Sequence, residues 1–436
     1  MHRIDLAILL ASTVILGIGL ISHKISRSHV TAPLITLVAG ALFGAGVLNV
    51  LPVPAAIQND LLEEASRLSL AIALTNTALM LRIEELRRRT RPGAVLLTVV
   101  MAGMWLISSV LIYRLFNTSF VLALLVGAMI SPTDPILART ISEGELAERW
   151  IPGRLRNVLL TESGLNDGLA FPFVLLALTL LTDRNVLGYW GLQIVLRAVI
   201  GGVLLGVVIG YGLGRLLRAV QDHEWITTRY YLALTVLLSL FSVMLGNVLG
   251  LDGFLTVFVA GIAFQSTRSL DETEQAHEVQ TTADLFFTLP VFFLFGLVLP
   301  WGAWIQLGWR ALAIVIAVLL LRRIPVLLLV WKIMTPHVNH WREALFAGWF
   351  GPIGVSALFY VTFSLKRYQS PLVWPLVTLI ITASIVVHGA TAIPFTRALG
   401  HWEERVGGLD PDQKESPDGR DTSWAPLKQR VNQSLD

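Results

Sequence analysis

The sequence predicts an all-α polytopic membrane protein with about 13 transmembrane helices. Of its 436 residues, 54% are hydrophobic and only 14% are charged, whereas soluble domains carry about 25% charged residues. Many apolar runs exceed the roughly 18 residues that indicate a membrane-spanning helix. The small net charge of +3 argues against a nucleic-acid-binding surface. The lack of cysteine excludes disulfides, thiol catalysis and cysteine-bound metals.

Hydropathy divides the chain into successive apolar segments that are joined by short polar loops. From about residue 400 the composition shifts to Asp, Glu, Lys, Arg, Pro and Gln, which predicts a disordered cytoplasmic tail. The expected spans cover residues 4–22, 30–50, 61–81, 93–116, 119–140, 155–181, 189–217, 230–249, 253–266, 283–299, 304–331, 341–365 and 372–397.

A basic cluster at residues 87–91, with the sequence RRRTR, sets the expected topology. Cytoplasmic loops of membrane proteins carry an excess of Lys and Arg, so this cluster is placed in the cytoplasm. Counting spans from it puts the N-terminus outside and the C-terminus in the cytoplasm of a multi-pass protein of the cell (inner or plasma) membrane. Lys366 and Arg367 then fall on the outer side, against the rule.

Two polar motifs lie inside apolar spans, at residues 131–135 (SPTDP) and 161–168 (TESGLNDG). A charged side chain at the bilayer centre costs about 3 kcal/mol on insertion scales, so acidic residues there indicate function. Asp134 and Asp167, about thirty residues apart in the chain, therefore suggest a buried ion site.

Two of the expected spans are interrupted. Pro132 and Pro135 interrupt the fifth span, and Gly351 and Pro352 interrupt the twelfth. Each proline removes a backbone donor and clashes with the carbonyl one turn back. The freed carbonyls are tolerated at membrane depth only inside protein or beside a water-filled cavity. Two broken spans that run in opposite directions predict an inverted-repeat transporter with a site near the midplane.

These motifs also carry a family resemblance. The segments SPTDPILA (131–138) and ESGLNDGLAFPF (162–173) resemble the sodium/proton antiporter branch of the cation–proton antiporter superfamily. The second segment and GWFGPIGV (348–355) are most similar to NhaP-like bacterial antiporters, which are related to fungal plasma-membrane alkali-cation/proton antiporters. The resemblance implies an NhaA-like inverted-repeat fold with two unwound crossing helices, and a homodimer.

The resemblance further implies a division into two domains that move relative to each other. A dimerisation domain would comprise residues 1–91 and 184–302, and a core domain residues 92–183 and 303–399, followed by the tail at 400–436. Transport would then occur by an elevator-like movement of the core domain.

By the same resemblance, the candidate ion ligands lie in the two motifs. Asp167 would bind either the cation or the proton, with Asn166 as its structural neighbour. Thr133 would supply oxygens at the unwound crossing, Asp134 lies beside it, and Ser163 would be a further oxygen ligand. Na⁺ (or Li⁺ or K⁺) would thus be held by Asp167, Ser163 and Thr133, and no cofactor is expected.

The resemblance also implies that Glu162, a further charged residue in the second motif, forms a structural ion pair with an arginine of the eleventh span. Arg322 and Arg323 are the two candidates, and the spacing to Val326 favours Arg322. A lone buried glutamate at this position would be an uncompensated charge.

Two positions depart from the pattern of the resembled family. Asn76 takes the place of a glutamate that often helps to form the ion site, and this leaves the choice of cation open. The arginine-glycine pair that is usual in the twelfth span is missing, with Ile353 in its place.

The residues of the second motif suggest how one site could exchange ions. Ser163 and Asp167 are four residues apart, so they share one face of a helix. A carboxylate in a poorly solvated cavity can hold either a proton or a cation. Competition for that carboxylate, combined with alternating access, gives coupled exchange. A second carboxylate at position 166 would add a charge to the site. The amide of Asn166 adds none, which favours the exchange of one cation for one proton.

The expected function is therefore secondary active, electroneutral exchange of Na⁺ or Li⁺ for H⁺. A K⁺/H⁺ or broad alkali-cation antiporter is the alternative within this class. A cation channel would need a filter-like repeated carbonyl loop. An intramembrane aspartyl protease built on Asp134 and Asp167 would need a Gly-x-Gly-Asp motif, which the chain lacks.

Two other acidic features are expected to be structural. Asp252 lies at the start of the ninth span and is expected to be a helix N-cap. The acidic segment 271–278 is expected to be a loop with a solvated face, which could also attract cations.

Overall fold

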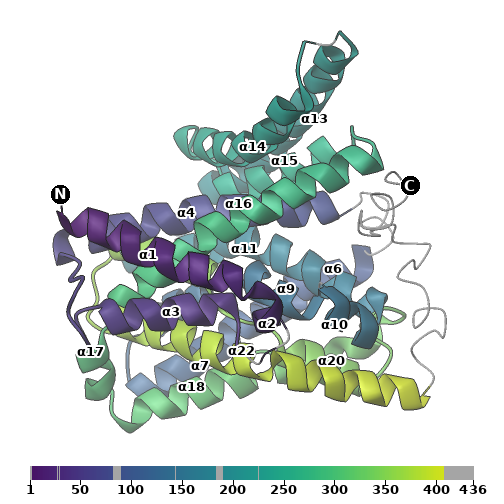
Figure 1. Ribbon diagram of the computed structural model, residues 1–436. Coiled ribbons are helices and arrows are strands. Elements are labelled where there is room, and N and C mark those ends of the chain that lie inside the picture. Colours follow the sequence, from purple (N-terminus) through teal and green to yellow (C-terminus); the bar gives the residue numbers. More distant parts are fainter. Residues whose placement is uncertain are drawn as a thin grey trace.

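The structure is a computed structural model that describes residues 2–26, 28, 30–81, 90–142, 144–182, 190–223 and 225–406. Within these ranges every regular element is a helix (Figure 1). The arginines at 87–89 and the tail beyond residue 406 lie outside the described residues. In the described part, six helices are long and apolar enough to cross a membrane, and six shorter apolar helices accompany them. This pattern is that of a polytopic membrane protein, and the total of 13 spans stays a prediction.

In the first half of the chain, the helices follow the expected spans, and the fifth span is broken into two. The bounds are α1 His2–Leu20, α2 Ser22–Ser26, α3 Ala32–Phe43, α4 Ala55–Met80, α6 Thr90–Val95, the π-helical turn η1 Leu96–Val100, α7 Met101–Phe116, α8 Phe120–Met129, α9 Pro135–Ser142, α10 Gly144–Trp150 and α11 Gly153–Thr182.

In the second half, the eleventh and twelfth spans are both broken. The bounds are η2 Trp190–Ile200, α13 Gly201–Asp222, α14 Thr228–Val248, α15 Gly253–Gln265, α16 Leu270–Leu297, α17 Trp301–Gln306, α18 Trp309–Leu321, α19 Ile324–Val330, the 3₁₀ turn η3 Trp331–Met334, α20 Trp341–Trp349, α21 Val355–Leu365 and α22 Val373–Val406.

Helix caps explain where two of these helices begin. Asp252 caps α15, as predicted, because its carboxylate accepts the backbone N–H groups of Phe254 and Leu255 at 3.1 and 3.0 Å. Ser269 and Glu272 form a capping box at the start of α16. The acidic segment 271–278 is therefore the beginning of α16, and the expectation of a loop is wrong, although Glu278 is exposed as a solvated face requires. Hydropathy had identified only the apolar part of this helix.

Glycine lets several helices approach each other closely, as small residues do in membrane proteins. α13 packs on α15 at Gly210, where a Cβ atom would come within 2.1 Å of the Ala260 carbonyl oxygen. α3 packs on α16 at Gly40, where a Cβ atom would lie 2.0 Å from the Phe293 carbonyl oxygen. Larger residues at these two positions would push the helices apart.

The helices pack as two neighbouring groups. α3, α4, α13, α14, α15 and α16 pack on one another, and so do α7, α8, α9, α11 and α18 to α22. α13 and α14 lie at one edge of the molecule in Figure 1, and α7, α18 and α20 lie at the opposite edge. α4 with α21, and α11 with α15, connect the two groups. The division into a dimerisation domain and a core domain stays a prediction.

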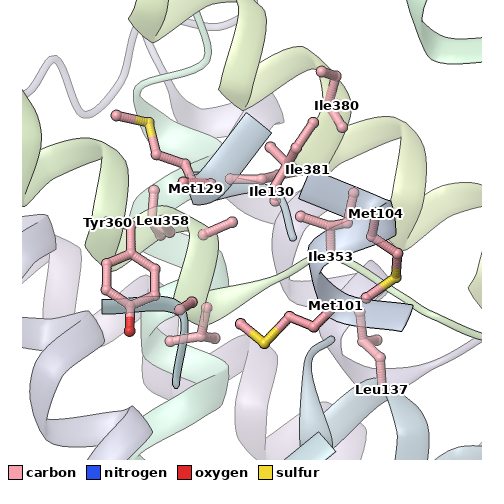
Figure 2. Close-up of a cluster of buried hydrophobic side chains, with 14 of the residues drawn as sticks. Met101, Met104, Met129, Ile130, Leu137, Ile353, Leu358, Tyr360, Ile380 and Ile381 are labelled. Carbon is pink, nitrogen blue, oxygen red and sulfur yellow. The ribbon is translucent and has the colours of Figure 1, made fainter. Parts of the chain in front are cut away.

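A cluster of buried hydrophobic side chains surrounds the two broken spans and fixes their position. Figure 2 shows side chains from α7, α21 and α22 packed with residues at both breaks. Ile130 lies in the first break and Ile353 in the second, and both are fully buried. The irregular backbone is thereby held inside protein, which is the condition for its presence at membrane depth.

Candidate functional site

The two breaks cross each other at the centre of the second helix group. Residues 130–134 separate α8 from α9, and residues 350–354 separate α20 from α21. The backbone N–H of Asp134 donates to the carbonyl of Pro352 at 2.8 Å, and the backbone N–H of Val355 donates to Asp134 Oδ2 at 2.6 Å. The two breaks, in which Asp134 and Val355 are 221 positions apart, are thus joined by one hydrogen bond in each direction.

Asp134 holds this crossing together through its carboxylate. It is fully buried, and its Oδ1 accepts the backbone N–H of Leu137 in the first turn of α9 at 3.1 Å. With the Val355 N–H on Oδ2, one carboxylate serves the N-termini of two half-helices. Because helix N-termini carry a partial positive charge, the negative charge of Asp134 is compensated there. This arrangement accounts for the buried carboxylate, and the role of Asp134 as an ion ligand stays a prediction.

Asn166 ties α11 to the first break. Its Nδ2 donates to Thr133 Oγ1 at 2.8 Å, and its Oδ1 accepts the backbone N–H of Thr133 at 3.2 Å. An ionised carboxylate at position 166 has no hydrogen to donate, so it could not form the bond to Thr133 Oγ1. The two predicted site residues are therefore brought together, with the amide in a positioning role.

Asp167 differs from its neighbours because its carboxylate is buried without a partner. The residue is fully buried, and neither Oδ1 nor Oδ2 has a hydrogen bond within the described chain. Its backbone carbonyl accepts the hydroxyl of Tyr360 from α21. Leaving a buried charged group unsatisfied is strongly unfavourable. The geometry thus presents two free carboxylate oxygens that can take up a proton or a cation.

Two serine hydroxyl groups, those of Ser163 and Ser356, are close to the Asp167 carboxylate. Ser163, one turn before Asp167 on α11, donates its hydroxyl proton to the carbonyl of Leu159 at 2.6 Å. Its oxygen keeps lone pairs with which it can accept or coordinate. Ser356 of α21 lies next to the Asp167 carboxylate and interacts with it. Ser356 and Tyr360 were not predicted from the sequence, although Ser356 comes only two residues after the second break.

The structure corrects the predicted ion pair. Glu162 pairs with Arg323, not with Arg322, through both carboxylate oxygens, and the Nη2–Oε2 distance is 2.6 Å. Arg323 Nε also donates to the carbonyl of Ala347 at 2.9 Å. The physical reason is a third break, because α18 ends at Leu321 and α19 begins only at Ile324. The two arginines therefore point to different partners.

Arg322 has a separate role at the crossing. Its guanidinium donates to the carbonyl of Ile130 in the first break and to the carbonyl of Gly351 in the second. Both carbonyls are freed by the breaks and need a donor at membrane depth. Arg322 therefore joins the eleventh span to both unwound segments.

Asn76 makes a contact that the sequence does not predict. It is fully buried on α4, and its Oδ1 accepts the hydroxyl of Thr281 from α16 at 3.2 Å. Within the described residues its Nδ2 has no hydrogen-bond partner, and no hydrogen bond joins it to the Asp167 carboxylate. The structure thus places Asn76 at the packing of α4 on α16.

Two ion-pair clusters connect the helix groups and were not predicted. Arg139 of α9 pairs with Asp284 of α16, and Thr288 Oγ1 donates to Asp284 Oδ1 at 3.0 Å. Lys366, at the end of α21, pairs with Asp60 and Glu63 of α4 at 2.7 and 2.9 Å.

Hydrogen bonds from Lys366 to Asp60 and Glu63 raise the pKa of this lysine above its ordinary value. Its charge is thus compensated locally, so the predicted placement of this lysine on the outer side would not leave an isolated charge there.

This arrangement can be compared with that of known proteins. The Na(+)/H(+) antiporter of Schizosaccharomyces pombe is 34% identical over 355 residues, which are 75% of this chain and 75% of that protein. The K(+)/H(+) antiporter NhaP2 of Shewanella is 26% identical over 333 residues, which are 75% of this chain and 56% of that protein. Other curated fungal relatives are longer, and the chain spans half of their length or less.

The sodium proton antiporter MjNhaP1 of Methanocaldococcus jannaschii has a similar structure. The TM-score is 0.71 at 16% sequence identity, and the match covers 92% of this chain and 99% of that chain. The likeness shows a shared fold. The family described as sodium/hydrogen exchanger, transmembrane, matches residues 8–398, which is most of the chain. The chain therefore belongs to the sodium/hydrogen exchanger family of transmembrane proteins.

Proposed function

We propose that the protein is a secondary active antiporter that exchanges Na⁺ for H⁺ across a cell membrane, with Asp167 as the group that binds either ion. The observation that carries this proposal is the fully buried Asp167 carboxylate, whose two oxygens have no hydrogen-bond partner in the described chain. Membership of the sodium/hydrogen exchanger family supports it. The neighbouring charges are already compensated, so Asp167 is the group left to take up ions.

Exchange follows from the physics of one carboxylate. A bare charge is unfavourable in the protein interior, so Asp167 is neutralised by either a proton or a cation. Ser163, one turn before Asp167, and Thr133, which is bonded to the neighbouring Asn166, are candidates to add hydroxyl oxygens. Carbonyls near the breaks are further candidate ligands. Because the two ions compete for the same oxygens, a carrier that alternates its access exchanges one for the other.

The alternation is an elevator-like movement in a homodimer. Residues 92–183 and 303–399 form the moving core, and residues 1–91 and 184–302 form the dimerisation domain. The two helix groups described above agree with this division. The N-terminus lies outside and the C-terminus in the cytoplasm.

The stoichiometry is one cation for one proton. Glu162 is paired with Arg323, and Asp134 with the N-termini of α9 and α21. Asn166 is an amide that holds Thr133. A single titrating carboxylate exchanges equal charge in the two directions, so the exchange is electroneutral.

Na⁺ is the favoured cation, and K⁺ or a broad range of alkali cations is the alternative. The Schizosaccharomyces pombe relative is named for Na⁺ and the more distant Shewanella relative for K⁺. Adding Na⁺, Li⁺ and K⁺ in turn to everted vesicles that report pH separates these possibilities. An antiporter for Na⁺ responds to Na⁺ and Li⁺ but not to K⁺.

The experiment that tests the function uses purified protein in proteoliposomes with an internal pH dye. We expect Na⁺ to drive proton flux in the wild type, with no effect of an imposed membrane potential. Asp167→Asn should abolish the flux because it removes the exchangeable charge while keeping the size of the side chain. Asp222→Asn, the same change at the exposed end of α13, is the matched control and should transport normally.

Near-normal flux in Asp167→Asn protein would refute the assignment of the site. Na⁺ movement without proton coupling would indicate a channel. A clear dependence on membrane potential would contradict the one-to-one stoichiometry.

A further inference from the structure

A third unpartnered oxygen lies beside the two free oxygens of Asp167. Ser356 is fully buried on α21, and its hydroxyl has no hydrogen-bond partner of regular geometry among the described residues. The same hydroxyl interacts with the Asp167 carboxylate. A buried hydroxyl normally finds a partner, most often a carbonyl one turn back in its own helix. Three buried oxygen atoms, two of Asp167 and one of Ser356, therefore lie close together and can still bind a further partner.

We infer that Ser356 is a ligand of the transported cation and sets the affinity of the site together with Asp167. The inference rests on the proposed function of Asp167 and adds a ligand from the opposite half of the inverted repeat. Alkali cations bind oxygen atoms, and a serine hydroxyl offers two lone pairs.

The position of Ser356 is fixed by the crossing of the two breaks. The preceding residue, Val355, donates its backbone N–H to Asp134 at 2.6 Å. At Gly354 a Cβ atom would lie only 2.1 Å from Asp134 Oδ2, so the start of α21 fits tightly against that carboxylate. One turn later on the same helix face, Tyr360 donates its hydroxyl to the Asp167 carbonyl. α21 is thus held on α11 both before and after Ser356.

The other hydroxyl groups near the site are already engaged. Ser163 donates to the Leu159 carbonyl, and Thr133 Oγ1 accepts from Asn166. The Ser356 hydroxyl, by contrast, interacts with the Asp167 carboxylate itself and keeps its lone pairs available. It can donate to Asp167 when the cation is absent and turn its lone pairs to the cation when one binds.

The test compares Na⁺ binding to purified protein in detergent by isothermal titration at fixed pH. We expect Ser356→Ala to raise the Kd for Na⁺ by about tenfold, the lower end of the range for a lost supporting ligand contact. Ser356→Cys should do the same, because it keeps the shape but replaces oxygen by sulfur, a poor ligand for an alkali cation.

Ser364→Ala is the matched control. Ser364 lies on the same helix two turns later and is equally buried, and its hydroxyl also has no partner within the described chain. Its removal should leave the Kd unchanged. The elution volume on size exclusion and the melting temperature of each variant check that the protein is folded. Since Ser356→Cys retains the side-chain volume, it answers the question even if Ser356→Ala does not fold.

The outcomes separate the inference from the function on which it rests. Wild-type Kd in both Ser356 variants, with binding lost in Asp167→Asn, overturns the role of Ser356 and leaves the antiporter site intact. Normal Na⁺ binding in Asp167→Asn overturns the proposed site itself. An equal loss in Ser364→Ala would show a general effect of α21 on folding and would overturn the inference as well.

Discussion

At the scale of single residues, three buried carboxylates lie around the crossing. The charge of two of them is compensated, each in a different way, and the charge of the third is not. Glu162 is neutralised by a bidentate ion pair with Arg323. Asp134 is compensated by the N-termini of two half-helices. The Asp167 carboxylate has no such partner in the described chain, and this contrast marks it as the exchanging group.

The pair of Glu162 and Arg323 gives a prediction for stability. Both side chains are only 2% exposed, so Arg323→Ala leaves a buried carboxylate without compensation. Breaking a buried pair in this way costs about 3–5 kcal/mol of folding free energy. We expect that loss in unfolding titrations of the purified protein. Removing both charges, with Glu162→Gln and Arg323→Gln together, should recover part of the loss.

Arg310→Ala serves as the control, because Arg310 is exposed at the start of α18 and its removal should change little. A double variant less stable than Arg323→Ala would contradict this account of the pair.

At the scale of secondary structure, the site depends on half-helices that end at the centre of the fold. The carbonyls freed at Ile130 and Gly351 both accept from Arg322. The free N–H groups at the starts of α9 and α21 are taken up by Asp134. Two charged side chains of opposite sign therefore satisfy two carbonyls and two N–H groups that the breaks leave free.

The closeness of α21 to Asp134 gives a prediction for this crossing. In Gly354→Ala the added Cβ would lie 2.1 Å from Asp134 Oδ2, so α21 must move. Overpacking of this kind costs about 1–3 kcal/mol and here also displaces Ser356 from the site. We expect a lower melting temperature and strongly reduced exchange. Gly212→Ala on α13, where a Cβ would meet nothing within 4 Å, should behave as wild type.

Retained exchange in Gly354→Ala protein would mean that the tight fit at this position is not needed for transport.

The elements that could be predicted from the sequence are those with a local signal. Pro132, Pro135 and Pro352 mark the first and second breaks, and both are present. The third break, at residues 322–323, also had a signal, because Pro325 lies in the first turn of α19 and helices tend to end before a proline. Hydropathy does not reveal this break because the apolar run continues on both sides of it, and spacing along an unbroken helix favours the wrong arginine for Glu162.

Long-range contacts had no such signal. Val355 meets Asp134 across 221 positions, and Tyr360 meets Asp167 across 193. Pairings of this kind depend on how the two halves of the chain pack, which hydropathy and spacing do not contain. Ser356 was overlooked for this reason.

At the scale of the whole molecule, two ion-pair clusters link the helix groups. Arg139 and Asp284 join α9 to α16, and Lys366 joins α21 to Asp60 and Glu63 of α4. The proposed elevator movement carries α9 and α21 past α4 and α16. These pairs must therefore separate and re-form in each transport cycle.

Cross-linking tests this requirement, and the absence of native cysteine makes it simple. With Arg139→Cys and Asp284→Cys in one chain, we expect a short bis-thiol reagent to stop exchange, because the bridge prevents the movement. Arg154→Cys with Glu343→Cys is the matched control. That ion pair joins α11 to α20 within the proposed core, so bridging it should leave the exchange of the same variant unchanged.

Full exchange after complete bridging of residues 139 and 284 would contradict the elevator movement.

The central claim is that a single carboxylate, Asp167, holds either the cation or the proton. It is tested most directly by counting the protons released when Na⁺ binds to the purified protein, from titration calorimetry in buffers of different ionisation enthalpy. The account predicts about one proton released per Na⁺ bound near neutral pH, since the two ions share one carboxylate. In Asp167→Asn protein neither binding nor release should remain. Na⁺ binding without proton release in the wild type, or unchanged release in Asp167→Asn, would contradict it.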